Sequence, residues 1–151
     1  MTILDTLALF KSLKARTDNK SEIKIYNIFI GILLDLERRK LSEAQLLLIE
    51  NELDKLELNA DVKNRRKYLS KKLDSFKKYL KDELSLISEG YYTAICISLG
   101  ISFGAAFGVV FDELFGISYG VSGGLLLGVV VGRLLDSQAE KQNRVLKIKN
   151  K

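Results

Sequence analysis

The sequence predicts an all-α protein, with a small N-terminal four-helix bundle followed by a two-helix transmembrane hairpin. Three observations support this fold class. Charged residues are frequent in residues 1–89, nearly absent from residues 90–132 and frequent again in residues 133–151. Apolar residues in the first part recur every three or four positions, as on a helix, and no run alternates as in a strand. Eight of the eleven glycines lie four residues apart in two series.

Four segments of the first part have the apolar periodicity of packed helices. They lie near residues 3–16, 22–39, 43–57 and 62–88. Thr2 can cap the first segment, residues 18–21 form a turn and cap before the second, and Ser42 with Gln45 has capping-box spacing before the third. The second segment is apolar on nearly all sides but too short to cross a bilayer, so we expect it to be the central buried helix.

The fourth segment follows a turn at residues 59–61 and leads toward the apolar part of the chain. A heptad-like seam runs along it, formed by Leu69, Leu73, Phe76 and Leu80. No Pro or Gly occurs between residues 60 and 89, so this helix either stops at Gly90 or runs on into the membrane. We favour a kinked or nearly continuous connection.

Two uncharged runs, residues 91–111 and 114–132, predict the transmembrane hairpin. At 1.5 Å per helical residue, each run extends for about 30 Å, the thickness of the hydrocarbon core of a bilayer. Only Asp112 and Glu113 separate the runs, so these residues mark the tip of the hairpin. The alternative is a soluble apolar hairpin buried in a large assembly.

Basic residues on both sides of the hairpin predict its orientation. Lys77, Lys78 and Lys81 precede the first span, and Arg133 opens a basic tail that extends over residues 133–151. Lys and Arg next to spans favour the cytoplasmic side, and the first residues lack the pattern of a signal peptide. We therefore expect the bundle and the tail in the cytoplasm, with these four side chains in contact with lipid head groups.

The two glycine series predict close packing of helices. The first comprises Gly100, Gly104 and Gly108, and the second comprises Gly116, Gly120, Gly124, Gly128 and Gly132. In lipid, small residues let helix backbones approach and associate. A four-residue row drifts by about 40° per step, so one straight neighbour cannot cover all five members of the second series. Either the second helix crosses its partner with a right-handed tilt or it also contacts another copy, and we expect a homo-oligomer.

Polar residues within the spans allow two interpretations. Ser98 and Ser102 lie four residues apart, and either pack as small residues or line a water-filled conduit. They are the candidate pore-lining residues, because Ser102 lies about 160° around the helix from Gly104. Cys96 stands among apolar residues and is expected to be a buried thiol, with lipid modification as the alternative.

Composition excludes several classes of function. The chain has no His and one Cys, which removes the commonest general base and any multi-cysteine zinc site. No nucleophile–base pair, metal cluster or phosphate loop is recognisable, so we expect no catalytic residue, no metal, no cofactor and no enzymatic activity. Residues 63–81 are rich in Lys and Arg, but we expect a solvated or lipid-facing helix surface there and no binding of nucleic acid.

A resemblance to a known group supports the hairpin. The segment LGISFGAAFG, followed after a short gap by GISYGVSGGLLLGVVVGRLLDSQAEK, resembles small bacterial glycine-zipper membrane proteins with two spans. The segment LSEAQLLLIENELDKLELNADVKNRRKYLSKKL ahead of ISEGYYTA is similar to uncharacterised members of that group from the Bacteroidetes. The resemblance implies the bacterial inner (cytoplasmic) membrane and no particular activity.

Two functional hypotheses follow from the sequence. The first is an oligomeric integral membrane protein, packed through glycine zippers, that forms a pore or permeable assembly gated by its cytosolic bundle. Its partners are membrane lipid and further copies of the chain. The alternative is a membrane-anchored adaptor, in which the hairpin only anchors the chain and the helical bundle binds a protein partner that the sequence does not identify.

Overall fold

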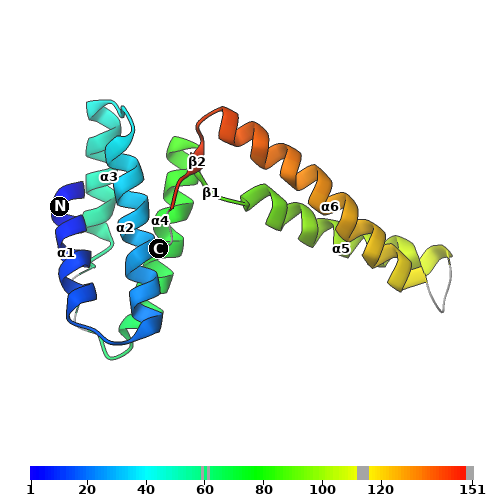
Figure 1. Cartoon of the computed structure of the whole chain (residues 1–151), viewed down its shortest axis with the longest axis horizontal. Helices are drawn as coiled ribbons and strands as arrows, with labels where there is room; N and C mark the ends of the chain where they lie inside the picture. Colours follow the sequence, from blue (N-terminus) through cyan, green and yellow to red (C-terminus); the bar gives the residue numbers. More distant parts are fainter. Residues whose placement is uncertain (59, 61, 112–115, 149–151) are drawn as a thin grey trace. The chain divides into compact units, whose positions relative to one another are not determined.

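A computed structural model describes residues 1–58, 60, 62–111 and 116–148 of the chain. These residues form six α-helices and two very short strands (Figure 1). They divide into two compact units, one containing Met1–Ile87 with the chain from Leu146 onward, and the other Ser88–Val145. The all-α fold class predicted from the sequence is confirmed.

Side-chain caps begin the four helices of the first unit. The helices are α1 (Ile3–Ala15), α2 (Lys20–Arg38), α3 (Glu43–Lys55) and α4 (Arg65–Leu84). Thr2 and Ser42 each form a capping box, which confirms the predicted starts of α1 and α3. The Asn19 side chain accepts a bond from the backbone N–H two residues on, and Asn64 caps α4 in the same manner three residues on. The turn expected at residues 59–61 includes positions outside the described residues.

Large apolar side chains fill the core of the bundle. Phe29 of α2 is fully buried and stacks on Phe10 of α1, with ring centroids 4.4 Å apart. The ring of Phe76 on α4 lies 6.3 Å from that of Phe29. The predicted seam of α4 is buried, and α2 contributes the largest set of buried residues, as expected of a central helix. Leu4 of α1 lies outside this core, because its side chain is 62% exposed.

The predicted continuity between α4 and the next helix is wrong. Ser85 caps α4 in a left-handed conformation, with φ of 55°, and its backbone N–H bonds to the carbonyl of Leu80. Gly90 also has a positive φ, of 72°. Between them lies strand β1 (Ile87–Ser88), which pairs with β2 (Val145–Leu146) in a two-stranded sheet. Strands of two residues are too short to show alternation, so the sequence contains no signal for them.

The last described residues pack on the bundle. Leu146 is 1% exposed and belongs to the same core cluster as the phenylalanines. Ile148 lies over Gly31 of α2, where an added Cβ would come within 2.7 Å of the Ile148 Cγ2 atom. The segment expected as one basic tail therefore contains the end of a helix, a strand and a segment packed on the bundle. Charge alone could not reveal this division, because Leu146 and Ile148 are two apolar residues among many Lys and Arg.

Two long helices form the second unit and lie side by side (Figure 1). Helix α5 (Tyr91–Phe111) coincides with the first uncharged run, and α6 (Gly116–Lys141) covers most of the second run and continues beyond Gly132. The predicted tip, Asp112 and Glu113, lies outside the described residues. Within the described chain, α5 and α6 are the helices long and apolar enough to cross a membrane.

Candidate functional site: the glycine interface of the hairpin

The two glycine series face each other across the hairpin in one register. The pairs in contact are Gly100 with Gly124, Gly104 with Gly120, and Gly108 with Gly116. Each four-residue step forward along α5 is matched by a four-residue step backward along α6, so the helices are antiparallel. The three glycines of α5 all lie on this contact.

The interface leaves no space for a side chain. A Cβ added at Gly100 would lie 2.9 Å from the carbonyl carbon of Gly124, and one added at Gly120 would lie 3.0 Å from the Cα of Gly108. These obstacles are backbone atoms, which cannot rotate away as a flexible side chain can. At Gly123, by contrast, an added Cβ would meet no atom within 4 Å. Glycine is therefore required at the packed positions of the row but not throughout α6.

One neighbouring helix covers all five glycines of the second series. A Cβ at Gly128 would lie 2.9 Å from the Cα of Ile97, and one at Gly132 would lie 3.0 Å from the backbone nitrogen of Thr93. A repeat of four residues is longer than the 3.6 of a straight helix and corresponds to right-handed winding, which keeps such a row against one partner. The second neighbour expected from the drift of the row is therefore not needed, and the row gives no reason to infer another copy.

Asp136 of α6 closes the open end of the hairpin. Its Oδ1 accepts a hydrogen bond from the backbone N–H of Tyr92 at 3.0 Å. Its Oδ2 accepts one from the Thr93 backbone N–H at 3.0 Å and one from the Thr93 hydroxyl at 2.6 Å. The first N–H groups of a helix lack partners within it, so a carboxylate there satisfies them and complements the helix dipole. Sequence reasoning overlooked Asp136, although it lies four residues beyond Gly132 and continues the row.

The candidate pore-lining serines lie on the exposed surface of α5 and bond to their own helix. The Ser98 hydroxyl donates to the carbonyl of Ala94, and the Ser102 hydroxyl donates to that of Ser98, both at 2.9 Å. On α6, Ser122 bonds to Ser118 in the same way at 2.8 Å. Because each hydroxyl donates its proton to a carbonyl of its own helix, these serines can face lipid without an unpaired donor, and their exposure does not by itself indicate water beside them.

The residues expected to contact lipid head groups lie on two helices. Lys77, Lys78 and Lys81 belong to α4, and Arg133 belongs to α6. The side chains of Lys78 and Arg133 are exposed, whereas Lys81 is partly buried and lies 3.3 Å from the Asp82 carboxylate. Their contact with head groups stays a prediction.

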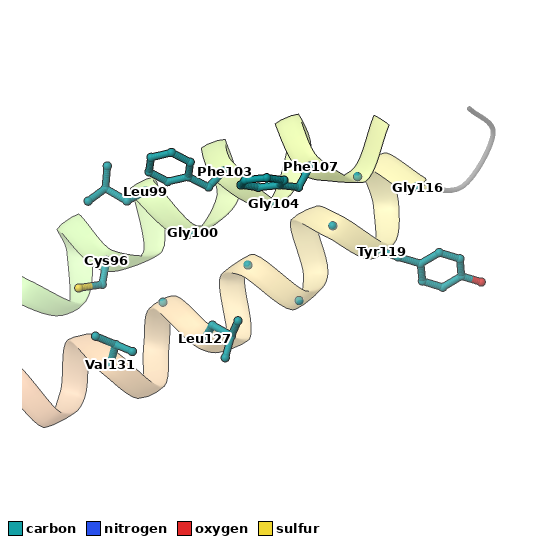
Figure 2. Close-up of a pocket in the computed structure, with 15 residues that line it drawn as sticks. Cys96, Leu99, Gly100, Phe103, Gly104, Phe107, Gly116, Tyr119, Leu127 and Val131 are labelled. Atoms are coloured by element: carbon teal, nitrogen blue, oxygen red, sulfur yellow. The ribbon is translucent and has the colours of Figure 1, made fainter. Parts of the chain in front are cut away.

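An apolar groove runs along the hairpin beside the glycine interface (Figure 2). It has a volume of about 670 Å³. Leu99, Phe103 and Phe107 line it from α5, while Leu127 and Val131 line it from α6. Cys96 also lines the groove, and its free thiol is partly exposed and not buried as expected.

Little of the apolar surface of the hairpin is covered within the chain. In the most apolar stretches of these helices, only 6% of the residues of α5 and 11% of those of α6 are buried. A core helix of a soluble domain would be mostly buried. Large apolar side chains, among them Phe107 and Val110, are instead exposed. Such a surface is suited to hydrocarbon and not to water.

The comparisons with known proteins agree with this geometry. Residues 88–138 match the family described as Glycine zipper membrane protein. This match and the two candidate spans together indicate a membrane protein. The resemblance to glycine-zipper membrane proteins is thereby confirmed for residues 88–138, whereas the bundle lies outside the matched residues. No curated protein and no solved structure gives a significant match to the chain.

Proposed function

We propose that the chain is a non-enzymatic membrane anchor that presents its helical bundle to a protein partner. The hairpin inserts into the bacterial cytoplasmic membrane with both termini in the cytoplasm. One observation carries the proposal: all eight glycines of the two series pack within a single hairpin. Because the glycine rows of α5 and α6 pack against each other, the hairpin can anchor a domain without contact to other copies of the chain.

The surface of the bundle supports the binding of a protein partner. Leu47 and Leu48 are consecutive residues of α3 with side chains that are 60% and 50% exposed. Exposed leucines that do not contribute to the core are suited to an apolar contact with another protein. The four-helix unit is therefore the part of the chain that we assign to recognition.

A homo-oligomer that encloses a conduit is the second candidate. A further row of small residues, Ala94, Ser98, Ser102 and Ala106, lies on α5 at four-residue spacing, and all four are exposed. Rows of small residues favour helix association in lipid, so this row is the surface through which copies would pack. In that arrangement Ser98 and Ser102 lie either at the contact between copies or beside the conduit.

Reconstitution in liposomes distinguishes the two functions. For the anchor, we expect single-molecule photobleaching to show mainly one copy per particle, and no ion flux above that of empty liposomes. A stable oligomer with flux that Ser102→Leu abolishes would support the conduit and contradict the anchor.

Topology is tested separately in cells, with an impermeant thiol reagent and Cys96 replaced by Ala. We expect a cysteine at Glu113 to react from outside intact cells and one at Ser137 to react only after permeabilisation. The reverse pattern would contradict cytoplasmic termini.

A further inference from the structure

We propose that a basic pocket on the surface of the bundle binds the phosphate group of an organic phosphate. The pocket lies within the first unit of the chain and has a volume of about 200 Å³. Three basic residues line it, Lys14 of α1, Arg38 of α2 and Lys147 of the segment that returns to the bundle after the hairpin. A ligand at this place is additional to the anchoring role of the hairpin.

The charge of the lining selects an anion. Among the described residues, Lys14, Arg38 and Lys147 have no carboxylate as an ion-pair partner. Asp35 also lines the pocket, but its carboxylate lies 2.8 Å from the Arg39 Nε and both side chains are only 11% exposed. The negative charge of Asp35 is therefore compensated within α2. Like charges that line one concave site repel each other, and a bound anion relieves this repulsion.

The donors of the pocket favour a phosphate ester over a carboxylate. The guanidinium of Arg38 can bond to two oxygens of one phosphate, and the Asn27 amide is a neutral donor in the same lining. A phosphate monoester carries about 1.5–2 negative charges near neutral pH, whereas a carboxylate carries one. Ile30 and Leu34 are half-buried in the lining and offer apolar contact to the carbon atoms of the ester.

Lys147 lines the pocket because its two neighbours in sequence are fixed on the bundle. Leu146 is buried in the core, and Ile148 lies over Gly31 of α2. The site is therefore complete only while this segment is docked. A ligand that binds only the docked state stabilises it by mass action. A bound phosphate should thus slow the release of residues 145–148 from the bundle, and this gives a measurable signal.

Hydrogen exchange of the full chain in nanodiscs tests the proposal with two sources of the same chemistry. Glycerol 3-phosphate is the probe in the soluble arm, in which the nanodiscs contain phosphatidylcholine alone. The lipid arm has no soluble phosphate, and phosphatidic acid is added to the nanodiscs. Mass spectrometry follows the backbone amides of residues 145–148. We expect exchange to slow at least about threefold at saturation in one arm or both.

Variants of equal charge separate the pocket from general attraction of anions. Lys14→Gln, Arg38→Gln and Lys147→Gln should each raise the ligand concentration at half-effect by roughly threefold to tenfold. Lys11→Gln and Lys40→Gln remove the same charge from exposed positions outside the lining, so they should leave that concentration unchanged. Circular dichroism checks that each variant keeps its helices.

Ile148→Ala tests the contribution of the docked segment. Ile148 does not line the pocket, but its loss weakens the contact with Gly31 that holds Lys147 in place. We expect this variant to weaken binding as Lys147→Gln does. Binding at full strength by Ile148→Ala and Lys147→Gln would overturn the proposed participation of the segment.

The two arms identify the source of the phosphate. Slower exchange with glycerol 3-phosphate supports a soluble ligand, and slower exchange only with phosphatidic acid supports a lipid head group, provided that the pocket variants weaken the effect. An equal effect of the pocket variants and of Lys11→Gln and Lys40→Gln would mean that anions respond to net charge alone. That result, or unchanged exchange in both arms, would overturn the proposal and leave the anchoring role of the hairpin unaffected.

Discussion

The bundle and the hairpin are both built from packed helices, but they use side-chain size in opposite ways. In the bundle, large rings such as Phe10, Phe29 and Phe76 fill the space between helices. In the hairpin, glycines remove side chains from that space, so that backbone meets backbone. Burial of large apolar groups is favourable in water. It gains almost nothing in lipid, where close contact between helices is decisive. The comparison shows that the surrounding solvent determines which residue size stabilises a helix pair.

The largest expected effect is that of a large-to-small substitution in the bundle. Phe29→Ala removes a fully buried ring that stacks on Phe10, and should lower the free energy of unfolding by about 3–5 kcal/mol. Urea titration of the full chain in detergent, followed by far-UV circular dichroism, measures the change. Leu47→Ala is the control, because Leu47 is mostly exposed and its loss should change stability by no more than about 0.5 kcal/mol. Equal effects of the two variants would contradict the assignment of the core.

Replacement of glycine by alanine in α6 should destabilise the hairpin at Gly124 but not at the adjacent Gly123. A Cβ at Gly124 would lie 2.7 Å from the carbonyl carbon of Gly100, so Gly124→Ala should cost about 1–3 kcal/mol. Gly123→Ala should be neutral or stabilise by up to about 1 kcal/mol, because alanine favours helix and the added methyl meets nothing. Energy transfer between labels on α5 and α6 during titration with SDS measures both. The same sign for both variants would show that the row is not the interface.

Loss of the Asp136 cap should have a similar or smaller effect. Asp136→Ala leaves two backbone N–H groups at the start of α5 without their partner, at a cost of about 1–3 kcal/mol. Glu140→Ala removes an exposed carboxylate of the same helix and serves as the control. A double-mutant cycle with Thr93→Val in the same titration should give a coupling energy of at least about 0.5 kcal/mol. Additive effects of the two substitutions would mean that the bond between the Thr93 hydroxyl and Asp136 contributes nothing to stability.

The smallest expected effect is that of a helix cap in the bundle. Ser42→Ala removes the side-chain acceptor of the α3 capping box and should cost about 1 kcal/mol. Ser75→Ala, at an exposed position within α4, should not destabilise the chain, because alanine is the better helix former. The urea titration used for Phe29→Ala resolves both. Destabilisation by Ser75→Ala as large as that by Ser42→Ala would contradict the role of the cap.

Local sequence patterns predicted the positions of the helices, but they could not predict which distant residues contact each other. The capping boxes, the seam of α4 and the first span each depend on residues close together in the chain, and the structure has them where expected. Periodicity shows that a row such as 116–132 faces something, but it does not identify the partner. The bonds of Asp136 to Thr93 connect residues 43 positions apart, and no local pattern contains such a pairing. The end of α4 was missed because Ser85 adopts a left-handed conformation that glycine usually supplies.

The return of the chain to the bundle has a consequence for the order of assembly. Leu146 and Ile148 complete packing on the first unit, yet the ribosome makes them after both α5 and α6. The hairpin is thus an insertion within a discontinuous domain. Translation proceeds from the N-terminus, so the final core contacts of the bundle form only once the hairpin has been synthesised. The core of the bundle is therefore completed only after the membrane hairpin has been made.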